Sequence, residues 1–219
     1  MFILSTGKAL AIAAMAGLSG FGIAANLADG AAKPVAFGRY EVTWREWKAC
    51  YDDGGCSFLP QPGRDVTEGD FPVTDVNRFD VDEYISWINA KSGRTYRLPT
   101  ADEWSAISGG LSRRKTKKLF DDPRLAWAAD YGSMQQVPAK VQPSGSFGAG
   151  ANGISDLGGN VWEWTSTCAA KSAAGADCPA YIADGLHEAN VSVFIRDPAS
   201  GGCAVGTPPA NIGFRLVAD

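Results

Sequence analysis

Apolar positions in the middle of the chain recur at helical spacing. Four of them form one stripe at i, i+3, i+4 and i+7: Val81, Tyr84, Ile85 and Ile88. Asn77 stands before the stripe, where an N-cap belongs, and Gly93 follows it as a stop signal. The pattern predicts an amphipathic helix over residues 79–91 with one buried face.

Two capping boxes mark the starts of two further helices. Thr43 and Glu46 are three residues apart, as are Thr100 and Glu103. At this spacing the side chains and the backbone exchange hydrogen bonds that satisfy the free N–H groups of a first helical turn. A glycine pair follows each segment shortly afterwards and ends it, so both helices are expected to be short.

Short apolar runs elsewhere predict strands. They cover residues 33–42, 191–195 and 211–217, and residues 71–76 are expected to form a short extended piece. Segments rich in glycine, proline and small polar residues separate these elements at 57–70, 119–150 and 197–209. The chain has 26 glycines and 7 tryptophans among 219 residues, which fits many loops around an aromatic core. The prediction is a loop-rich α+β domain with few short helices and strands.

The first 28 residues have the layout of an export signal. A short start with one lysine precedes an uncharged apolar run, and small residues follow near Ala24 and Ala25. This hydrophobic helix is either a cleaved signal peptide or an uncleaved membrane anchor, because its length is close to that of a membrane span. Both alternatives predict a periplasmic or extracellular domain, secreted or tethered to the membrane.

Five cysteines have a suggestive distribution. Cys50 and Cys56 bracket a tight turn, and Cys168 and Cys178 bracket a loop of small residues. Two short-loop disulfides are expected in an oxidising compartment, which leaves Cys203 unpaired. The alternative is a cytosolic protein with five reduced cysteines, and the N-terminal segment argues against it.

Charge restricts the choice of partners. The net charge is −4, so nucleic acid is not the expected partner. The single histidine, His187, excludes a multi-histidine metal site within this chain.

Five of the six residues from Arg113 to Lys118 are basic. This run is either a solvated face or a contact with anionic lipid headgroups or an acidic partner.

The stretch 152–165 concentrates glycine, tryptophan and acidic side chains. Gly158, Gly159 and Val161 can offer carbonyl oxygens beside the carboxylate of Glu163, which is the oxygen chemistry that Ca²⁺ prefers. The alternative is a tight turn that leads into a buried strand, with Glu163 in a salt bridge. The residues alone favour this alternative.

Five motifs in order resemble one family. They are Tyr-Glu-Val-Thr at 40–43, Phe-Pro-Val-Thr-Asp-Val at 71–76, Tyr-Arg-Leu-Pro-Thr-Ala-Asp-Glu-Trp at 96–104, Gly-Gly-Asn-Val-Trp-Glu-Trp-Thr at 158–165, and Gly-Phe-Arg-Leu-Val at 213–217. Residues 33–219 resemble the formylglycine-generating-enzyme domain, also called the sulfatase-modifying-factor domain. The resemblance implies a variant of the C-type lectin fold, and it favours Ca²⁺ at Gly158, Gly159, Val161 and Glu163. It also implies a second Ca²⁺ site near Asp130 and Tyr131.

The resemblance leads to two alternative functions. Family members that make formylglycine hold Cu(I) between two cysteines near the C-terminus, where this chain has Cys203 after Gly201–Gly202 and no second cysteine. Relatives that act as sulfoxide synthases use a separate domain with histidine iron ligands, which His187 alone cannot replace. The expected function is a non-catalytic binding or accessory subunit with a protein partner, including in a membrane complex. The alternative is a copper-dependent oxidase or maturation enzyme that uses Cys203.

Two arginines within the motifs, Arg97 and Arg215, are interpreted as buried ion-pair formers in a loop-rich core. This interpretation assigns them to the fold and not to catalysis.

Overall fold

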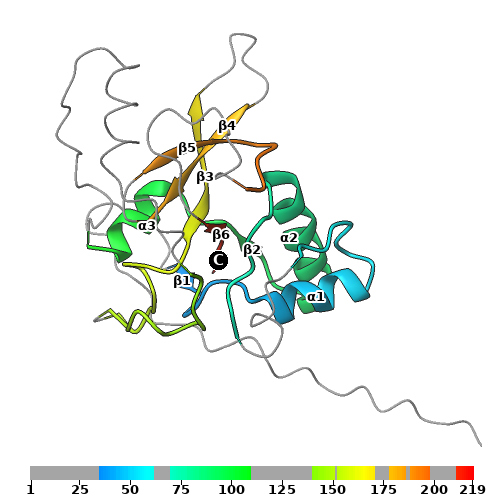
Figure 1. Cartoon of the computed structure of the whole chain (residues 1–219), viewed down its shortest axis with the longest axis horizontal. Coiled ribbons are helices and arrows are strands. Elements are labelled where there is room, and N and C mark those ends of the chain that lie inside the picture. The colour runs from blue at the N-terminus through cyan, green and yellow to red at the C-terminus, as the bar shows by residue number, and fades with distance from the viewer. Residues whose placement is uncertain are drawn as a thin grey trace, which may run out of the picture.

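The computed structural model describes residues 35–61, 70–109, 140–150, 152–170, 178–185, 188–197 and 211–219. These segments contain three short helices and two small sheets joined by loops (Figure 1). The α+β architecture with few short elements is therefore confirmed. The N-terminal hydrophobic segment, the basic run from Arg113 to Lys118 and Cys203 lie outside the described residues.

The three helices begin where the sequence predicts. They are α1 (Trp44–Asp52), α2 (Arg78–Ser92) and α3 (Ala101–Ile107). Thr43 and Thr100 form the predicted capping boxes, and Asn77 forms a third one with Asp80. Gly93 ends α2 in the left-handed conformation at φ 66°, which glycine adopts without strain. Helices α1 and α2 lie side by side (Figure 1).

The strands form two separate sheets. The smaller sheet has the order β1 (Ala36–Phe37), β7 (Val217–Ala218) and β2 (Tyr96–Arg97), all antiparallel. The larger sheet has the order β5 (Ala189–Ser192), β4 (Ala180–Asp184), β3 (Trp162–Ala170) and β6 (Ile212–Gly213). Strands β3 and β6 are parallel, so the C-terminal segment joins this sheet beside the Glu163 region.

The predicted strands differ from these in extent. Residues 33–42 contribute only β1, residues 71–76 contribute a single bridge from Pro72 to Thr43, and the strand expected at 191–195 lies earlier as β5. The single strand predicted at 211–217 is wrong, because this segment divides into β6 and β7 in different sheets. Arg215 lies between the two strands, and its fully buried guanidinium contacts Glu163 of β3.

Tryptophans hold the loops to the core. Trp47 stacks on Tyr84 with ring centroids 5.6 Å apart, and its Nε1 donates to the carbonyl of Phe58 at 2.9 Å. Trp164 donates in the same way to the carbonyl of Val76 at 3.0 Å. Both indoles are fully buried, so each one satisfies a loop carbonyl while it fills the core.

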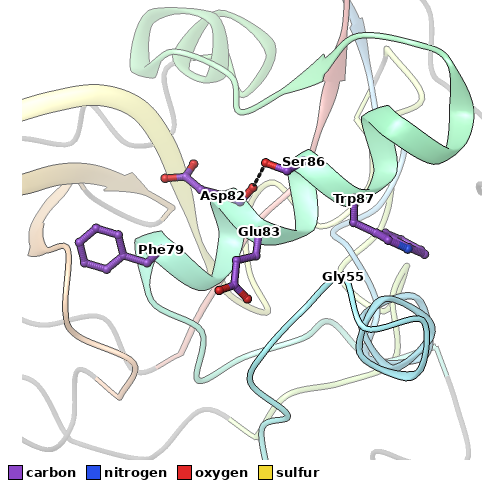
Figure 2. Close-up of a pocket in the computed structure, with 6 residues that line it drawn as sticks. All are labelled: Gly55, Phe79, Asp82, Glu83, Ser86 and Trp87. Carbon is purple, nitrogen blue, oxygen red and sulfur yellow. Dashed lines mark hydrogen bonds between the residues drawn. The ribbon is translucent and has the colours of Figure 1, made fainter.

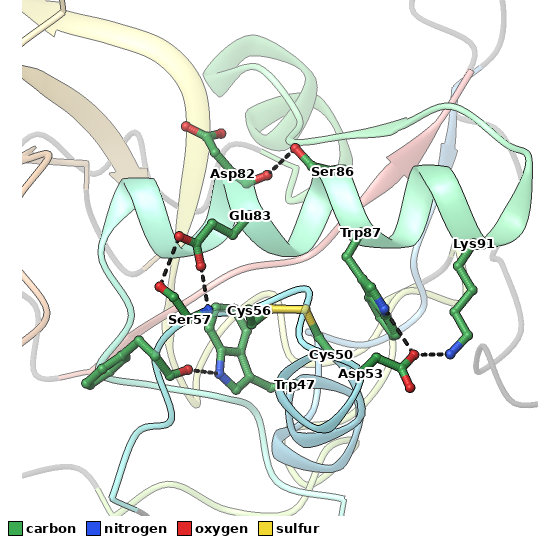
Figure 3. Close-up of a disulfide and its surroundings, with 11 residues drawn as sticks. Trp47, Cys50, Asp53, Cys56, Ser57, Asp82, Glu83, Ser86, Trp87 and Lys91 are labelled. Carbon is green, nitrogen blue, oxygen red and sulfur yellow. Dashed lines mark hydrogen bonds and ion pairs between the residues drawn. A yellow bond between two sulfur atoms is a disulfide. The ribbon is translucent and has the colours of Figure 1, made fainter.

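Both predicted disulfides are confirmed. Cys50–Cys56 closes the turn after α1, where Figure 3 shows it beside α2, and Cys168–Cys178 joins β3 to the segment before β4. Two disulfides suggest an oxidising environment outside the cytoplasm. Within the described part of the chain, no helix is long and apolar enough to cross a membrane.

Candidate functional site

Glu163 forms a buried ion pair with Arg215. Nε of Arg215 donates to Oε2 at 2.7 Å and Nη2 donates to Oε1 at 2.6 Å, and both side chains are 0% exposed. Nε1 of Trp104 donates to the same carboxylate at 2.8 Å. The two hydrogen bonds from Arg215 make a bidentate pair with the Glu163 carboxylate, which is the strongest form of an arginine–carboxylate contact. It confirms the expectation that Arg215 is a buried ion-pair former.

Arg215 also ties distant segments together. Its Nη1 donates to the carbonyl of Gly38 at 3.0 Å, and its Nη2 donates to the carbonyl of Ser155 at 3.0 Å. These carbonyls belong to the segment after β1 and to the loop before β3. One guanidinium therefore links three parts of the chain that are remote in sequence.

Asp156 anchors the loop that precedes β3. Its carboxylate accepts from the backbone N–H groups of Gly145 and Phe147, the latter at 2.8 Å. The side chain amide of Asn160 exchanges two further hydrogen bonds with the backbone of Gln142, at 2.9 and 3.1 Å. Asp156 and Asn160 have φ of 66° and 69°, a conformation that these residue types tolerate better than most. The two side chains hold residues 140–150 against the start of β3.

Glu41 is the unusual member of this region. Its side chain is buried, and no described residue donates a hydrogen bond to either carboxylate oxygen. Burial raises the pKa of Glu41 to about 8; Arg215 opposes the shift, and the charges of Glu163 and Asp156 add to it. The acid is therefore largely protonated at neutral pH. We call Glu41, Asp156, Glu163 and Arg215 the buried charge cluster.

Part of this cluster is not predicted from the sequence. Glu41 lies in the motif at 40–43, and its position between the apolar Tyr40 and Val42 is the signal that could have identified a buried acid. No comparable signal identifies Trp104 as a donor to Glu163, because the two residues are 59 positions apart.

The Ca²⁺ site at Gly158, Gly159, Val161 and Glu163 remains a prediction. Both carboxylate oxygens of Glu163 already accept hydrogen bonds from the guanidinium of Arg215, which restricts how this carboxylate could bind a cation. A cation at this position would share or displace that contact, so the side chains fit the ion pair better than a carboxylate-ligated cation. Over the described segments, no group of three or more histidine, cysteine or acidic residues is arranged to hold a metal ion.

Other predicted site residues fall outside the described residues or act elsewhere. Cys203, His187 and the second Ca²⁺ position at Asp130–Tyr131 are outside. Arg97 pairs with Glu103 at 2.8 Å and with Asp219 at 3.1 Å, as an ion-pair former should. Its side chain is 33% exposed, so it is less buried than predicted.

Fold and site together define a loop-rich α+β domain built on a buried arginine–glutamate pair. The family model for the sulfatase-modifying factor enzyme 1-like domain matches residues 22–219. The chain belongs to this family, which confirms the resemblance drawn from the five motifs.

Curated relatives fall into two groups. The chain is 31% identical to a hercynine oxygenase of Mycolicibacterium thermoresistibile over 164 residues, which covers 59% of this chain and 35% of the relative. It is 33% identical to a formylglycine-generating enzyme of Mycobacterium tuberculosis over 143 residues, which covers 58% of this chain and 44% of the relative. The chain thus spans less than half the length of either relative.

A solved structure supports the fold. PvdO from Pseudomonas aeruginosa superposes with a TM-score of 0.54 at 20% identity, covering 91% of each chain. At this identity the likeness shows the shared architecture alone.

Proposed function

We propose that this protein is a non-catalytic member of the family that serves outside the cytoplasm as a binding or accessory subunit, including in a membrane complex. One observation carries the proposal. The chain has five cysteines, and the disulfides Cys50–Cys56 and Cys168–Cys178 use four of them. A copper site of two thiolates cannot be built from Cys203 alone.

The two disulfides also support the extracytoplasmic part of the proposal. Each closes a short loop, and such bonds persist in oxidising compartments. If the N-terminal segment is retained as an anchor, the domain is held at the membrane surface, where a complex with a membrane protein is the natural role.

A copper and oxygen assay tests this function. The protein is purified anaerobically with Cu(I), and its copper content and its oxygen consumption with a cysteine-containing peptide are measured, beside a Cys203→Ser variant. We expect no stoichiometric copper, no peptide-dependent oxygen uptake and no difference between the two proteins. One copper per chain that disappears in the variant, together with aldehyde formation in the peptide, would overturn the proposal.

The second candidate is a copper-dependent formylglycine-generating oxidase or a related maturation enzyme that uses Cys203. The similarity to a protein named formylglycine-generating enzyme favours it. The incomplete thiol set places it second, and the same assay separates the two functions.

A further inference from the structure

A pocket opens on the outer face of α2. It has a volume of about 520 Å³ and is lined by Gly55, Phe79, Asp82, Glu83, Ser86 and Trp87 (Figure 2). Five of these residues recur at i, i+3, i+4, i+7 and i+8 along α2, on the side away from the buried Val81, Tyr84 and Ile88. We call this side of the helix the α2 face; Trp87 packs partly against the core at one end of it, and the rest of the face points to solvent.

Aromatic rings stand at both ends of the α2 face. Phe79 is 50% exposed and touches Phe194, which is 73% exposed, with ring centroids 5.4 Å apart. Trp87 stands at the other end, two turns along the helix (Figure 2). Paired aromatic rings with this much exposure are typical of binding surfaces, where burial by a partner recovers their hydrophobic free energy.

Acidic groups occupy the middle of the face. Asp82 and Glu83 line the pocket, and the six lining residues include no basic side chain. Arg78 contacts Asp82 at 2.9 Å, but Arg78 is only 14% exposed whereas the Asp82 side chain is 51% exposed. The carboxylate of Asp82 is thus available to a cation that approaches from solvent.

The turn that carries Gly55 is closed by a disulfide and held against α2 by hydrogen bonds, so the pocket is preformed. The Cys50–Cys56 disulfide holds the turn that carries Gly55, and a Cβ at Gly55 would come within 2.3 Å of the Trp87 ring. Glu83 accepts from the backbone N–H of Ser57 at 2.7 Å (Figure 3). A preformed surface loses little conformational entropy when it binds.

We propose that the α2 face binds an extended segment of a partner protein that carries an arginine with an apolar residue two positions to either side, because side chains at i, i+2 and i+4 of an extended chain share one face. From Phe79 to Trp87 the helix rises about 12 Å over eight residue steps. An extended peptide covers that distance with about four residues. The apolar side chains would lie on the aromatic ends, and the arginine would pair with Asp82 and stack on a ring. This inference rests on the proposed accessory role and specifies the chemistry of its partner.

Peptide titration of the full chain tests the inference. The probe is the blocked pentapeptide Leu-Gly-Arg-Gly-Leu, with otherwise identical peptides that carry Gln or Glu at the centre as controls, and binding is followed by calorimetry or amide chemical shifts. We expect the Arg peptide to bind most tightly. Asp82→Asn and Phe79→Ala should each weaken it by about fivefold, which corresponds to a loss of about 1 kcal/mol.

Matched variants separate the face from general effects. Asp102→Asn makes the same change at an exposed position of α3, and Phe147→Ala removes a ring of equal exposure, 50%, far along the chain. We expect both variants to bind the Arg peptide as the parent does, and melting curves confirm that all four proteins are folded.

Three results would overturn the inference. The first is no binding of the Arg peptide at millimolar concentration, and the second is equal weakening by the α2-face variants and their controls. The third is a dimer of the parent in sedimentation that Phe79→Ala dissociates, because a second copy would then be the occupant. None of these results bears on copper content or oxygen uptake, so the accessory function stands or falls separately.

Discussion

Acidic side chains occupy two opposite environments in this protein. In the buried charge cluster, Glu163 is matched by Arg215 and Glu41 is buried without a hydrogen bond from any described residue. On the α2 face, Asp82 is half exposed and open to solvent. The same chemical group therefore serves the fold in one place and is available for binding in the other. A carboxylate becomes structural when burial removes the alternative of solvation.

Loss of Arg215 should have the largest effect. Arg215→Met leaves Glu163 buried without its counter-charge, which should lower the free energy of unfolding by about 3–5 kcal/mol or prevent folding. Arg97→Met is the control, because its ion pair is partly exposed and should cost about 1 kcal/mol or less. Urea unfolding followed by circular dichroism measures both. Equal costs would show that burial of the pair does not matter.

Replacing Glu41 with a residue that does not titrate should change the pH dependence of stability. Its pKa is about 8 in the folded protein, above the usual 4.5, so the folded state binds the proton more tightly than the unfolded chain. This stability is complete below pH 4.5 and is lost as the pH rises toward 8, at about 1.4 kcal/mol per pH unit.

The measurement is urea unfolding of the parent and of Glu41→Gln at several pH values. Between about pH 5.5 and 7.5 the parent should lose about 3 kcal/mol more than the variant, since the variant lacks the titrating group. Glu188→Gln, at an exposed position, should leave the slope of the parent unchanged. Parallel curves for parent and Glu41→Gln would contradict the assignment of a buried proton to Glu41.

Loss of an indole donor should cost more stability when its acceptor is a carboxylate than when its acceptor is a backbone carbonyl. Trp104→Phe removes a donor from the Glu163 carboxylate, and Trp47→Phe removes one from a neutral carbonyl. Hydrogen bonds to charged groups contribute more, so we expect costs of about 2 and 1 kcal/mol respectively. Thermal melts of the two variants provide the comparison, and a larger cost at Trp47 would contradict a stronger hydrogen bond from Trp104 to the Glu163 carboxylate.

Change on the α2 face should have the smallest effect on stability. Asp82→Asn removes only a surface ion pair with Arg78, so the free energy of unfolding should stay within about 0.5 kcal/mol of the parent. Chemical denaturation measures it. A loss of 2 kcal/mol or more would show that Asp82 is as structural as Glu163.

Local signals in the sequence predicted the local structure well. The capping boxes at Thr43 and Thr100, and the end of α2 at Gly93, depend on residues within one turn of each other. The disulfides close loops with separations of 6 and 10 residues. In each case the partners are neighbours in the chain, so spacing and residue type were sufficient.

Contacts between residues far apart in the chain could not be predicted from the sequence. The segment after Asn211 reads as one strand, but it divides into β6 and β7, and Arg215 between them contacts Glu163, 52 positions earlier. Glu41 joins the same cluster from near the start of the domain. The α2 face likewise needs Phe194, more than a hundred positions beyond Phe79. Periodicity carries no information about such pairings.

The most direct test of the structural role of Glu163 is a double-mutant cycle with Glu163→Gln and Arg215→Gln. Unfolding free energies of the parent, both single variants and the double variant are measured with Ca²⁺ and with a chelator. We expect a coupling energy of about 2–3 kcal/mol that is the same in both conditions, because the two side chains stabilise each other without a cation. A coupling below about 0.5 kcal/mol, or one that changes on chelation, would contradict this interpretation and would favour Glu163 as a Ca²⁺ ligand.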